Sequence, residues 1–540
     1  MPASRTPLFS ALRRVARLAA ARPTHAPPVD ELIEMEAAAA LSRRSFLRQA
    51  GAATAGLALL PALSACAPRL GAGAPRIAIV GAGLSGLNAA WKLRRAGYVA
   101  TVYEASTRTG GRTYTASDVV APGYTVELGG EFVDSTHADI FDLCEELGLS
   151  LVDRQAADHG RHTFFFGGRH HTEAEVVEAF RPLAARIQAD YDSMGEIVDF
   201  ENEGGATAFD RMSIAQYLDR IGASGLIREL LEVAYVTEYG LDVDEQSALN
   251  LVFLIGTDVS AGFQPFGDSD ERYKVDGGNQ RIADELAMRL DGQVRLGHVL
   301  ESVRPRGEGV RLAFAGPGGA MDVEADLVLL TLPFTMLRQV EIGVELPDWK
   351  RRAINELGYG TNAKLFAGTN GRPWRELGYS AESFADTGYQ LAWDHTETQG
   401  SSGGGLTLYS GGAQGIAVGE GTAEAQVARL MPGVEQVFPG TQAALNGLTS
   451  RFHWPSHPWT QGSYAAFRPG QWTTIAGAEI KPVGPLYFAG EHCSYEFQGY
   501  MNGAAETGRR AAQVIFTAMG RPSMGAVPRI PRRAEEPLAA

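Results

Sequence analysis

The sequence has few cysteines and no surplus of positive charge. Three cysteines, Cys66, Cys144 and Cys493, lie far apart among 540 residues, and no CxxC pair or His/Cys cluster at metal-ligand spacing accompanies them. This pattern excludes a disulfide framework and gives no reason to expect a metal site. The formal net charge is −15 and the basic residues form no stripe, which argues against a nucleic-acid partner.

The N-terminal region also lacks an apolar run long enough for a stable membrane span, which takes roughly 20 residues. Its mildly apolar stretch starts at Ala50 and is rich in Gly and Ala. Because the stretch follows the pair Arg43–Arg44, the segment resembles a twin-arginine export signal. The resemblance implies that the twin-arginine translocation machinery exports the chain to the periplasmic side.

Two interpretations of the end of this signal stay open. The letters LSAC, which end at Cys66, resemble a lipobox, and acylation of Cys66 would make the protein a membrane-anchored lipoprotein. Small residues on both sides of Cys66 also suit cleavage after Ala67. The segment before the arginine pair is long for such a signal, so translation starts at Met1 or at Met35.

The stretch RIAIVGAGLSGLNAAWKLRRAGYVATVYE predicts a dinucleotide-binding unit. The apolar run from Ile77 to Val80 suits a buried parallel strand. Gly81, Gly83 and Gly86 permit a tight turn, a close approach of the backbone to a pyrophosphate and close helix–strand contact. A helix and a second strand follow, and Glu104 stands where it can accept hydrogen bonds from a ribose 2′-OH.

A second pair of glycines follows this acidic residue within a few positions. The loop RTGGR contains Gly110 and Gly111, and Arg112 can offer a charged fork to a phosphate. Taken alone, the loop could be a plain turn. Together with the preceding unit it resembles the FAD-binding entry of the flavin amine oxidases, a family that includes monoamine, polyamine and L-amino-acid oxidases.

A closing motif of the same family stands near the C-terminus, in PLYFAGEHCSYEFQGYMNGAAETGRRAA. A strand leads to Glu491, and Gly499 opens a helix whose N-terminus suits an electron-rich flavin carbonyl. The resemblance covers roughly residues 76–515 and implies an FAD site. The cofactor-binding residues that we expect are Gly81, Gly83, Leu84, Ser85, Gly86, Glu104, Ala105, Gly111, Arg112, Gly129, Gly130, Glu131, Phe132, Val299, Glu491, Gly499, Tyr500 and Met501.

Three residues are implied by the resemblance to act on the substrate. Lys364 matches a lysine that holds a water at flavin N5, although a strand lysine is often only a surface residue. Tyr464 and Tyr500 match the two walls of an aromatic cage that orients a neutral amine, with packing tyrosines as the alternative. Ser463 stands where monoamine oxidases have the cysteine joined to flavin, so we expect FAD to be bound non-covalently.

The resemblance implies oxidation of an amine to an imine by hydride transfer to flavin N5, with O2 reduced to hydrogen peroxide. Phe132 replaces the arginine with which amino-acid oxidases bind a carboxylate, which favours an amine without one. Glu131 is a single acid and is insufficient to indicate a polyamine tunnel. An L-amino-acid oxidase, a dehydrogenase that uses an electron carrier and a non-catalytic flavin-bound scaffold remain alternatives.

The fold class expected is α/β, with a Rossmann-like FAD-binding domain and an interleaved α+β substrate-binding domain. The signal region spans 1–67 and a tether spans 68–75, while the Pro- and charge-rich segment 521–540 is expected to be disordered. The sequence does not predict an oligomeric state. The expected FAD-binding segments are 76–155, 270–340 and 450–520, and the expected substrate-binding segments are 156–269 and 341–449.

Overall fold

The computed structural model describes residues 75–157, 159–195, 197–400 and 403–519. The predicted signal region, the alternative translation starts, the tether apart from Pro75 and the predicted disordered tail all lie outside these residues. None of the helices within the described ranges combines the length and the apolar character that a membrane crossing requires.

A five-stranded parallel sheet carries the predicted nucleotide-binding unit. Its order is β20-β13-β1-β2-β9, so β13 lies between strands from the two ends of the described chain and pairs with both. All four residues of β1 are buried, as the apolar run predicted. The bounds are β1 Ile77–Val80, β2 Ala100–Tyr103, β9 Val294–Arg295, β13 Leu327–Leu330 and β20 Leu486–Phe488.

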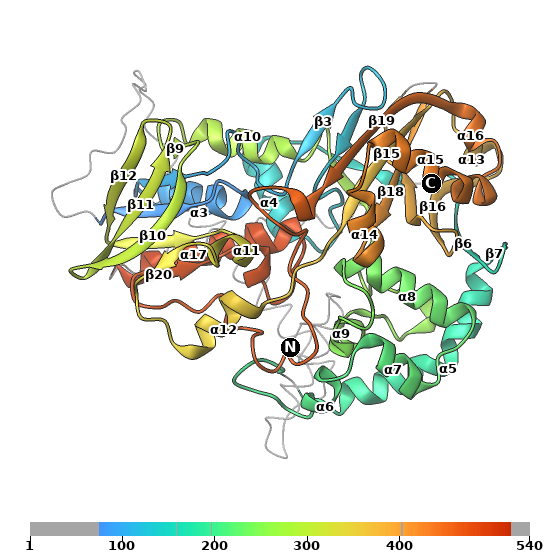
Figure 1. Cartoon of the computed structure of the whole chain (residues 1–540), viewed down its shortest axis with the longest axis horizontal. Helices are drawn as coiled ribbons and strands as arrows, with labels where there is room; N and C mark the ends of the chain where they lie inside the picture. The colour runs from blue at the N-terminus through green and yellow to red at the C-terminus, as the bar shows by residue number, and fades with distance from the viewer. Residues whose placement is uncertain (1–74, 158, 196, 401–402, 520–540) are drawn as a thin grey trace, which may run out of the picture. The chain divides into compact units, whose positions relative to one another are not determined.

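Helices from distant parts of the chain pack against this sheet. Helix α3 follows β1 directly and lies against α17, although about four hundred residues separate the two in sequence (Figure 1). The predicted order of strand, glycine turn, helix and strand is confirmed. The helices are α3 Leu84–Arg95, α4 Ala138–Leu147, α10 Gln280–Arg289 and α17 Met501–Ala518.

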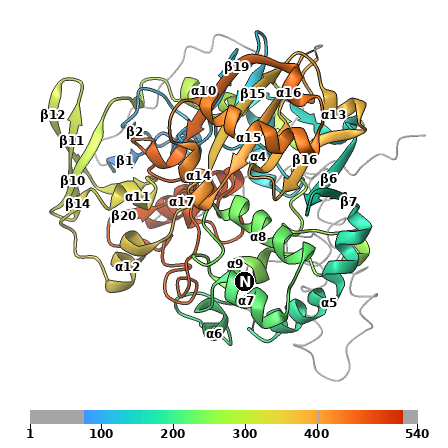
Figure 2. The same ribbon diagram turned by 45° about the vertical axis from the view of Figure 1, so that its right-hand side comes forward.

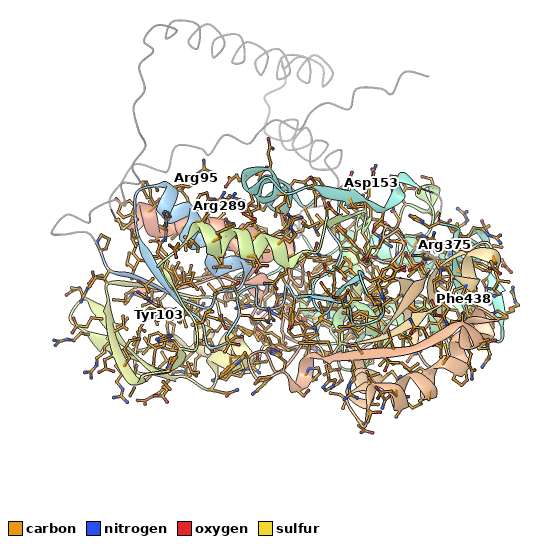
Figure 3. All side chains as sticks on the ribbon, turned by 90° about the horizontal axis from the view of Figure 1, so that it is seen from above. Arg95, Tyr103, Asp153, Arg289, Arg375 and Phe438 are labelled. Carbon is orange, nitrogen blue, oxygen red and sulfur yellow. The ribbon has the colours of Figure 1, made fainter. Side chains whose placement is uncertain are left out.

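A smaller sheet of order β12-β11-β10-β14 extends the nucleotide-binding part. Tyr103, at the end of β2 and labelled in Figure 3, stacks on Phe314 of β11 with 4.5 Å between ring centroids. This contact joins the small sheet to the parallel sheet. The strands of the small sheet are β10 Val299–Arg306, β11 Gly309–Gly316, β12 Gly319–Ala325 and β14 Glu341–Ile342. Two further sheets have two strands each. One pairs β3 Thr115–Ser117 with β4 Thr125–Glu127, and the other pairs β5 Leu151–Asp153 with β8 Tyr273–Val275.

A seven-stranded mixed sheet of order β19-β15-β18-β17-β16-β6-β7 forms the frame of the other part. A hairpin turn joins β6 to β7, where Gly167 and Gly168 have φ of +59° and +77°. The strands are β6 Arg161–Phe166, β7 Arg169–His171, β15 Ala363–Thr369, β16 Tyr379–Ala385, β17 Gln390–Asp394, β18 Gly404–Ser410 and β19 Leu445–His453.

The segment between about 173 and 260 forms one group of helices (Figure 2). Capping boxes start two of them, at Thr172 and at Ser213, and Gly240 in the left-handed region ends α8. These helices are α5 Glu173–Asp192, α6 Thr207–Asp210, α7 Ile214–Ile221, α8 Leu226–Tyr239 and α9 Ala248–Leu254. Elsewhere lie α11 Phe334–Leu337, α12 Asp348–Glu356, α13 Pro373–Glu376, α14 Gly412–Val418, α15 Ala423–Val437 and α16 Thr441–Ala444, with short 3-10 turns at Arg154–Ala156, Val259–Ala261, Trp454–Ser456 and Glu491–Cys493.

The expected α/β fold class is confirmed, but strand pairing shifts two predicted segment boundaries. The boundary at 340/341 separates β14 from β10, with which β14 pairs in parallel. The boundary at 449/450 falls inside β19, and all of β19 lies in the seven-stranded sheet beside β15. Sequence patterning could not place these edges, because each depends on a strand partner distant in the chain.

Candidate active site

The glycine turn after β1 leaves open space at the start of α3. Gly81 has φ of +108°, and a Cβ on Gly86 would stand 2.1 Å from the Gly81 carbonyl oxygen, so both positions require glycine. A Cβ on Gly83 would meet no atom within 4 Å. No side chain caps α3 at this position, so its first N–H groups are available to an anion such as a pyrophosphate.

The second pair of glycines lies directly against the first turn. The Gly110 N–H donates to the Ala82 carbonyl at 2.8 Å, and a bridge pairs Gly110 with Gly83. A Cβ added to Gly111 would stand 3.2 Å from Gly83 Cα. The two glycine-rich loops therefore form one surface, which explains why the second pair follows the acidic residue so soon.

Glu104 lies at the carboxyl end of β2 and faces the same turn. Its carboxylate accepts hydrogen bonds from the N–H groups of Ala82 at 2.7 Å and Ser106 at 2.8 Å. Burial raises the pKa of the Glu104 carboxyl, while these N–H groups oppose the shift. The Glu104 carbonyl accepts from His298, the residue before Val299, so the expected ribose and adenine contacts lie at one edge of the sheet.

Glu491 connects three segments at the opposite end of the site. Its carboxylate accepts from Arg112 Nη1 at 2.6 Å, from the Ala465 N–H at 3.2 Å and from the Gly499 N–H at 2.8 Å. Arg112 also donates to the Ser463 carbonyl. The guanidinium expected to offer a fork to phosphate is thus engaged with the protein, and Glu491 positions the loop before α17.

The N-terminus of α17 lies against the loop of Gly129 to Phe132. A Cβ on Gly130 would stand 2.7 Å from Met501 Cγ. Helix α17 begins at Met501, its N-cap residue Tyr500 makes no side-chain cap, and its first turn has no acidic residue. The starts of α3 and α17 therefore both present backbone donors, and the buried Ser85 hydroxyl has no hydrogen-bond partner. These features suit a ligand with phosphates at one end and an electron-rich ring at the other.

Lys364 is buried in β15 and is bound to the same glycine loop. Its Nζ donates to the carbonyls of Glu127 at 3.0 Å and Gly129 at 2.9 Å, and to Glu131 Oε2 at 2.7 Å. Lys274 Nζ donates to the other Glu131 oxygen at 2.6 Å. Burial opposes ionisation of Glu131, but the two lysines outweigh it and hold the pKa of this carboxyl well below its ordinary range. Glu131 is therefore a bound anion within the loop.

Phe132 lies between aromatic and cationic neighbours. The Arg154 guanidinium lies 4.2 Å from the centroid of its ring, and Trp393 makes an edge contact at 5.6 Å between centroids. Arg154 itself is paired with Glu397 and Glu382 and donates to the Glu271 carbonyl at 2.6 Å. A guanidinium thus lies behind Phe132, but its donors are used by these groups.

Tyr464 and Tyr500 meet at the end of α8. The Tyr464 hydroxyl donates to the Glu238 carbonyl at 2.6 Å, and the Tyr500 hydroxyl donates to Glu238 Oε1 at 2.9 Å. Tyr464 also exchanges a hydrogen bond with Tyr409 at 2.9 Å between their oxygens. Burial, together with the nearby Tyr409 and Glu238, raises the pKa of Tyr464 well above its ordinary value, so this phenol stays protonated.

The structure thus brings the expected residues together in two connected places. The glycine turns, Glu104 and Val299 lie at one end. At the other end Lys364 binds the loop of Gly129 to Phe132, and Tyr464 and Tyr500 both bind Glu238. Tyr409, opposite Lys364 on β18, shares a hydrogen bond with Tyr464 and so connects the two groups. At the expected thiol position, the Ser463 hydroxyl donates to Asn362 Oδ1 at 2.6 Å. The free cysteines of the described ranges, Cys144 and Cys493, are buried elsewhere.

Sequence patterning missed several residues of this site. Glu238 belongs to AYVTEYG, a stretch whose pattern is typical of core and in which Ala234, Tyr235 and Thr237 are fully buried. Tyr409 stands directly opposite Lys364 on the paired strand β18. Lys274 gave one usable signal, because it is a single lysine in the otherwise apolar strand β8.

Comparisons with known proteins agree with this geometry. A sequence model of the family described as flavin containing amine oxidoreductase matches residues 84–516. An L-amino acid dehydrogenase of Synechocystis sp. is 24% identical over 460 residues, which cover 81% of this chain and 94% of that protein. A flavin-containing amine oxidase of Danio rerio is 25% identical over 460 residues, which cover 82% of this chain and 86% of that protein. The structure of cyclohexylamine oxidase from Brevibacterium oxydans superposes with a TM-score of 0.73 at 23% identity, covering 83% of this chain and all of that one.

Proposed function

Because the chain belongs to the family of flavin-containing amine oxidoreductases, we propose that it oxidises an amine to an imine. The carbon that bears the nitrogen loses a hydride and the nitrogen loses a proton, which forms the C=N bond. Water then hydrolyses the imine to a carbonyl compound with release of ammonia or an amine. The observation that carries this proposal is that Lys364 binds the Gly129 carbonyl of the glycine loop, while Tyr464 and Tyr500, at the start of α17, both bind Glu238.

We propose that FAD is the cofactor and that it is held without a covalent bond. The glycine turns and the start of α3 would hold its pyrophosphate, Glu104 its ribose, and the start of α17 its ring. When bound, FAD supplies the hydride acceptor at N5. Ser463 lacks the nucleophilic sulfur that a covalent link at this position would need. Denatured protein should therefore release all of its flavin, and flavin retained on the chain would contradict this.

The residues of the chain orient the substrate and control its surroundings. Hydrogen bonds to Glu238 fix the hydroxyls of Tyr464 and Tyr500, so their rings can hold the amine in one orientation and exclude water. Lys364 fixes the Gly129 carbonyl and neutralises Glu131. These contacts support a preorganised site that needs no separate acid–base pair among its own side chains.

We propose O2 as the electron acceptor, with hydrogen peroxide as the second product. The names of the similar proteins include both an oxidase and a dehydrogenase, so a carrier dye must be compared with O2. We expect the purified protein to form one peroxide per amine oxidised in air, across a panel of monoamines, diamines and L-amino acids. Turnover only with the dye would identify a dehydrogenase, and turnover only of amino acids would favour the alternative substrate class.

We also propose that the chain is exported in folded form with its cofactor and anchored through Cys66. This rests on the arginine pair and the LSAC letters of the sequence alone. The mass of the mature N-terminal peptide tests it. An acylated Cys66 is expected, a peptide that starts at Pro68 would indicate simple cleavage, and an unprocessed N-terminus would contradict export.

A further inference from the structure

The carboxylate of Glu131 is held by side chains from three strands that lie apart in the sequence. Its Oε1 atom accepts from Lys274 Nζ of β8 at 2.6 Å and from Trp393 Nε1 of β17 at 3.0 Å. Its Oε2 atom accepts from Lys364 Nζ of β15 at 2.7 Å. All four side chains are buried, and a buried carboxylate is stable only when it is paired and hydrogen-bonded. The loop of Gly129 to Phe132 is thereby joined to two separate sheets.

The contacts of Lys364 account for all of its donors. A lysine ammonium carries three N–H donors, and those of Lys364 are directed at the carbonyls of Glu127 and Gly129 and at Glu131 Oε2. A water at flavin N5 would have to displace one of these acceptors. Of the three acceptors only the Glu131 carboxylate bears a charge, and its contact is the shortest. This carboxylate therefore sets the direction of the ammonium.

The partners of the other carboxylate oxygen fix Glu131 in turn. Lys274 Nζ lies 4.9 Å from the centroid of the Phe132 ring, and Trp393 contacts the same ring edge-on at 5.6 Å between centroids. Both partners of Oε1 thus also contact the next residue of the loop, so the carboxylate cannot turn without breaking these contacts. One carboxylate also serves two buried ammonium groups. Its loss would leave both without their shared anion, which disfavours the charged form of each.

We propose that Glu131 is a positioning residue that keeps the Lys364 ammonium charged and directed at the Gly129 carbonyl. This inference rests on the proposed function, in which the loop of Gly129 to Phe132 lies against the flavin. A carboxylate that acts through Lys364 sets the place of this loop, and with it the distance between the flavin and the bound amine. An error in that distance slows the chemical step more than it weakens amine binding.

The test compares wild type with Glu131→Gln, which keeps the size of the side chain and removes its charge. Each holoenzyme is mixed anaerobically with the best amine of the panel, and the flavin absorbance gives the limiting rate of reduction and the dissociation constant of the amine. We expect Glu131→Gln to lower the limiting rate about ten-fold or more and to leave the amine dissociation constant within about two-fold of wild type.

Glu146→Gln is the matched control. Glu146 also accepts from a lysine and an indole, Lys92 Nζ at 2.7 Å and Trp91 Nε1 at 2.9 Å, but these contacts join α3 to α4 and do not involve the glycine loop. Loss of this carboxylate therefore removes a similar set of bonds from another part of the protein. The control should leave both constants unchanged.

A double variant separates action through Lys364 from a general structural role. If Glu131 acts through Lys364, Glu131→Gln should lower the limiting rate no further once Lys364 is replaced by Met. Independent structural damage would instead multiply the two losses. Should Glu131→Gln alone fail to fold because two ammonium groups lose their anion, it is compared with wild-type Glu131 in the Lys274→Met background, where we expect the same loss of about ten-fold.

Release of flavin from the holoenzyme on dilution, followed by the rise in flavin fluorescence, gives a measurement that needs no turnover. We expect Glu131→Gln to raise the FAD dissociation constant several-fold, with no further rise when it is added to Lys364→Met. An unchanged limiting rate, a loss confined to amine binding or losses that multiply in the double variant would overturn the inference. If wild type oxidises no amine, the proposed function fails, and the FAD dissociation constants of the single and double variants still decide whether Glu131 acts through Lys364.

Discussion

Lys364 shows how a residue's surroundings decide between a packing role and a chemical one. All seven residues of β15 are buried, so this lysine does not belong to an exposed alternating face, which was the ordinary explanation of a strand lysine. A buried ammonium must be paired with acceptors. Its three acceptors are Glu127, Gly129 and Glu131, and the last two belong to the loop of Gly129 to Phe132 that we expect to contact the flavin. The buried ammonium of Lys364 therefore fixes the position of this one loop.

Replacement of Lys364 by Met is predicted to lower kcat/KM by about 10²–10³-fold, the usual effect of removing one preorganised charged donor from an active site. The variant should still take up flavin, because the glycine turns and Glu104 are untouched. Steady-state kinetics with the best amine, together with the flavin content of each preparation, measures this effect.

Lys274→Met is the matched control, since it removes the other lysine from Glu131 but leaves the Gly129 carbonyl bound. We expect the control to be several-fold more active than Lys364→Met. Equal losses in both variants would mean that Lys364 only neutralises Glu131, and full activity in Lys364→Met would remove it from the reaction.

Single residues also show where sequence patterning ends. The glycine positions and Glu104 were predictable because each is fixed by the backbone within one local unit. Glu238 was not, because its role arises from contacts with Tyr464 and Tyr500, which are more than two hundred residues away. A glutamate in the last turn of a helix was a weak signal, visible only once the helix end was known.

Among the elements, α12 carries a buried lysine whose amine joins segments that are distant in the chain. Lys350 is fully buried in this helix, and its Nζ donates to the carbonyls of Ala478 at 2.6 Å and Glu479 at 2.7 Å. The ammonium also lies 3.8 Å from the centroid of the Phe488 ring. These contacts attach the segment before β20 to a helix from the middle of the chain. Burial lowers the pKa of Lys350 to about 7.

This shift predicts a pH dependence of stability with a definite sign. Between about pH 8 and 10 the unfolded lysine keeps a proton that the folded one has released, so unfolding takes up a proton and its free energy rises with pH. Below about pH 8 the opposite effect of Glu479 intervenes, because burial raises the pKa of that carboxyl to about 8. We expect wild type to gain about 2 kcal/mol relative to Lys350→Met from pH 8 to 10.

Denaturant unfolding of both proteins at the two pH values measures this difference. Lys481→Met serves as the control, because Lys481 is a partly exposed lysine of the same region, paired with Glu201. The control should keep most of the wild-type rise, because Lys481 is the smallest of the causes that shift the pKa of Lys350. A wild-type curve parallel to that of Lys350→Met would show that the folded lysine has an ordinary pKa.

The elements themselves were predictable to different degrees. The strands of the parallel sheet and the capped helices follow from apolar runs, turn glycines and Ser or Thr caps. The order of the seven-stranded sheet was not predictable, since β6 pairs in parallel with β16 across more than two hundred residues. Such pairings depend on the packed whole, and they also moved the predicted edges at β14 and β19.

For the described part of the molecule as a whole, the main feature is that segments remote in sequence meet around one site. Arg112 of the first glycine unit binds Glu491 of the closing motif, and α3 packs on α17. The sequence motifs at the two ends predicted this meeting through family resemblance. The positions of the residues that we propose to face the amine were not predictable in this way. They depend on how the interleaved segments between the two motifs fold over the loop of Gly129 to Phe132.

The most direct test of the central claim is an anaerobic titration of the purified protein with an amine, followed by its visible absorbance. If the assembled site binds FAD and presents the amine to it, the protein is yellow and the flavin band bleaches in proportion to the amine added, while admission of O2 restores it. A colourless protein that takes up no FAD, or a yellow one whose band no amine or amino acid bleaches, would contradict the account.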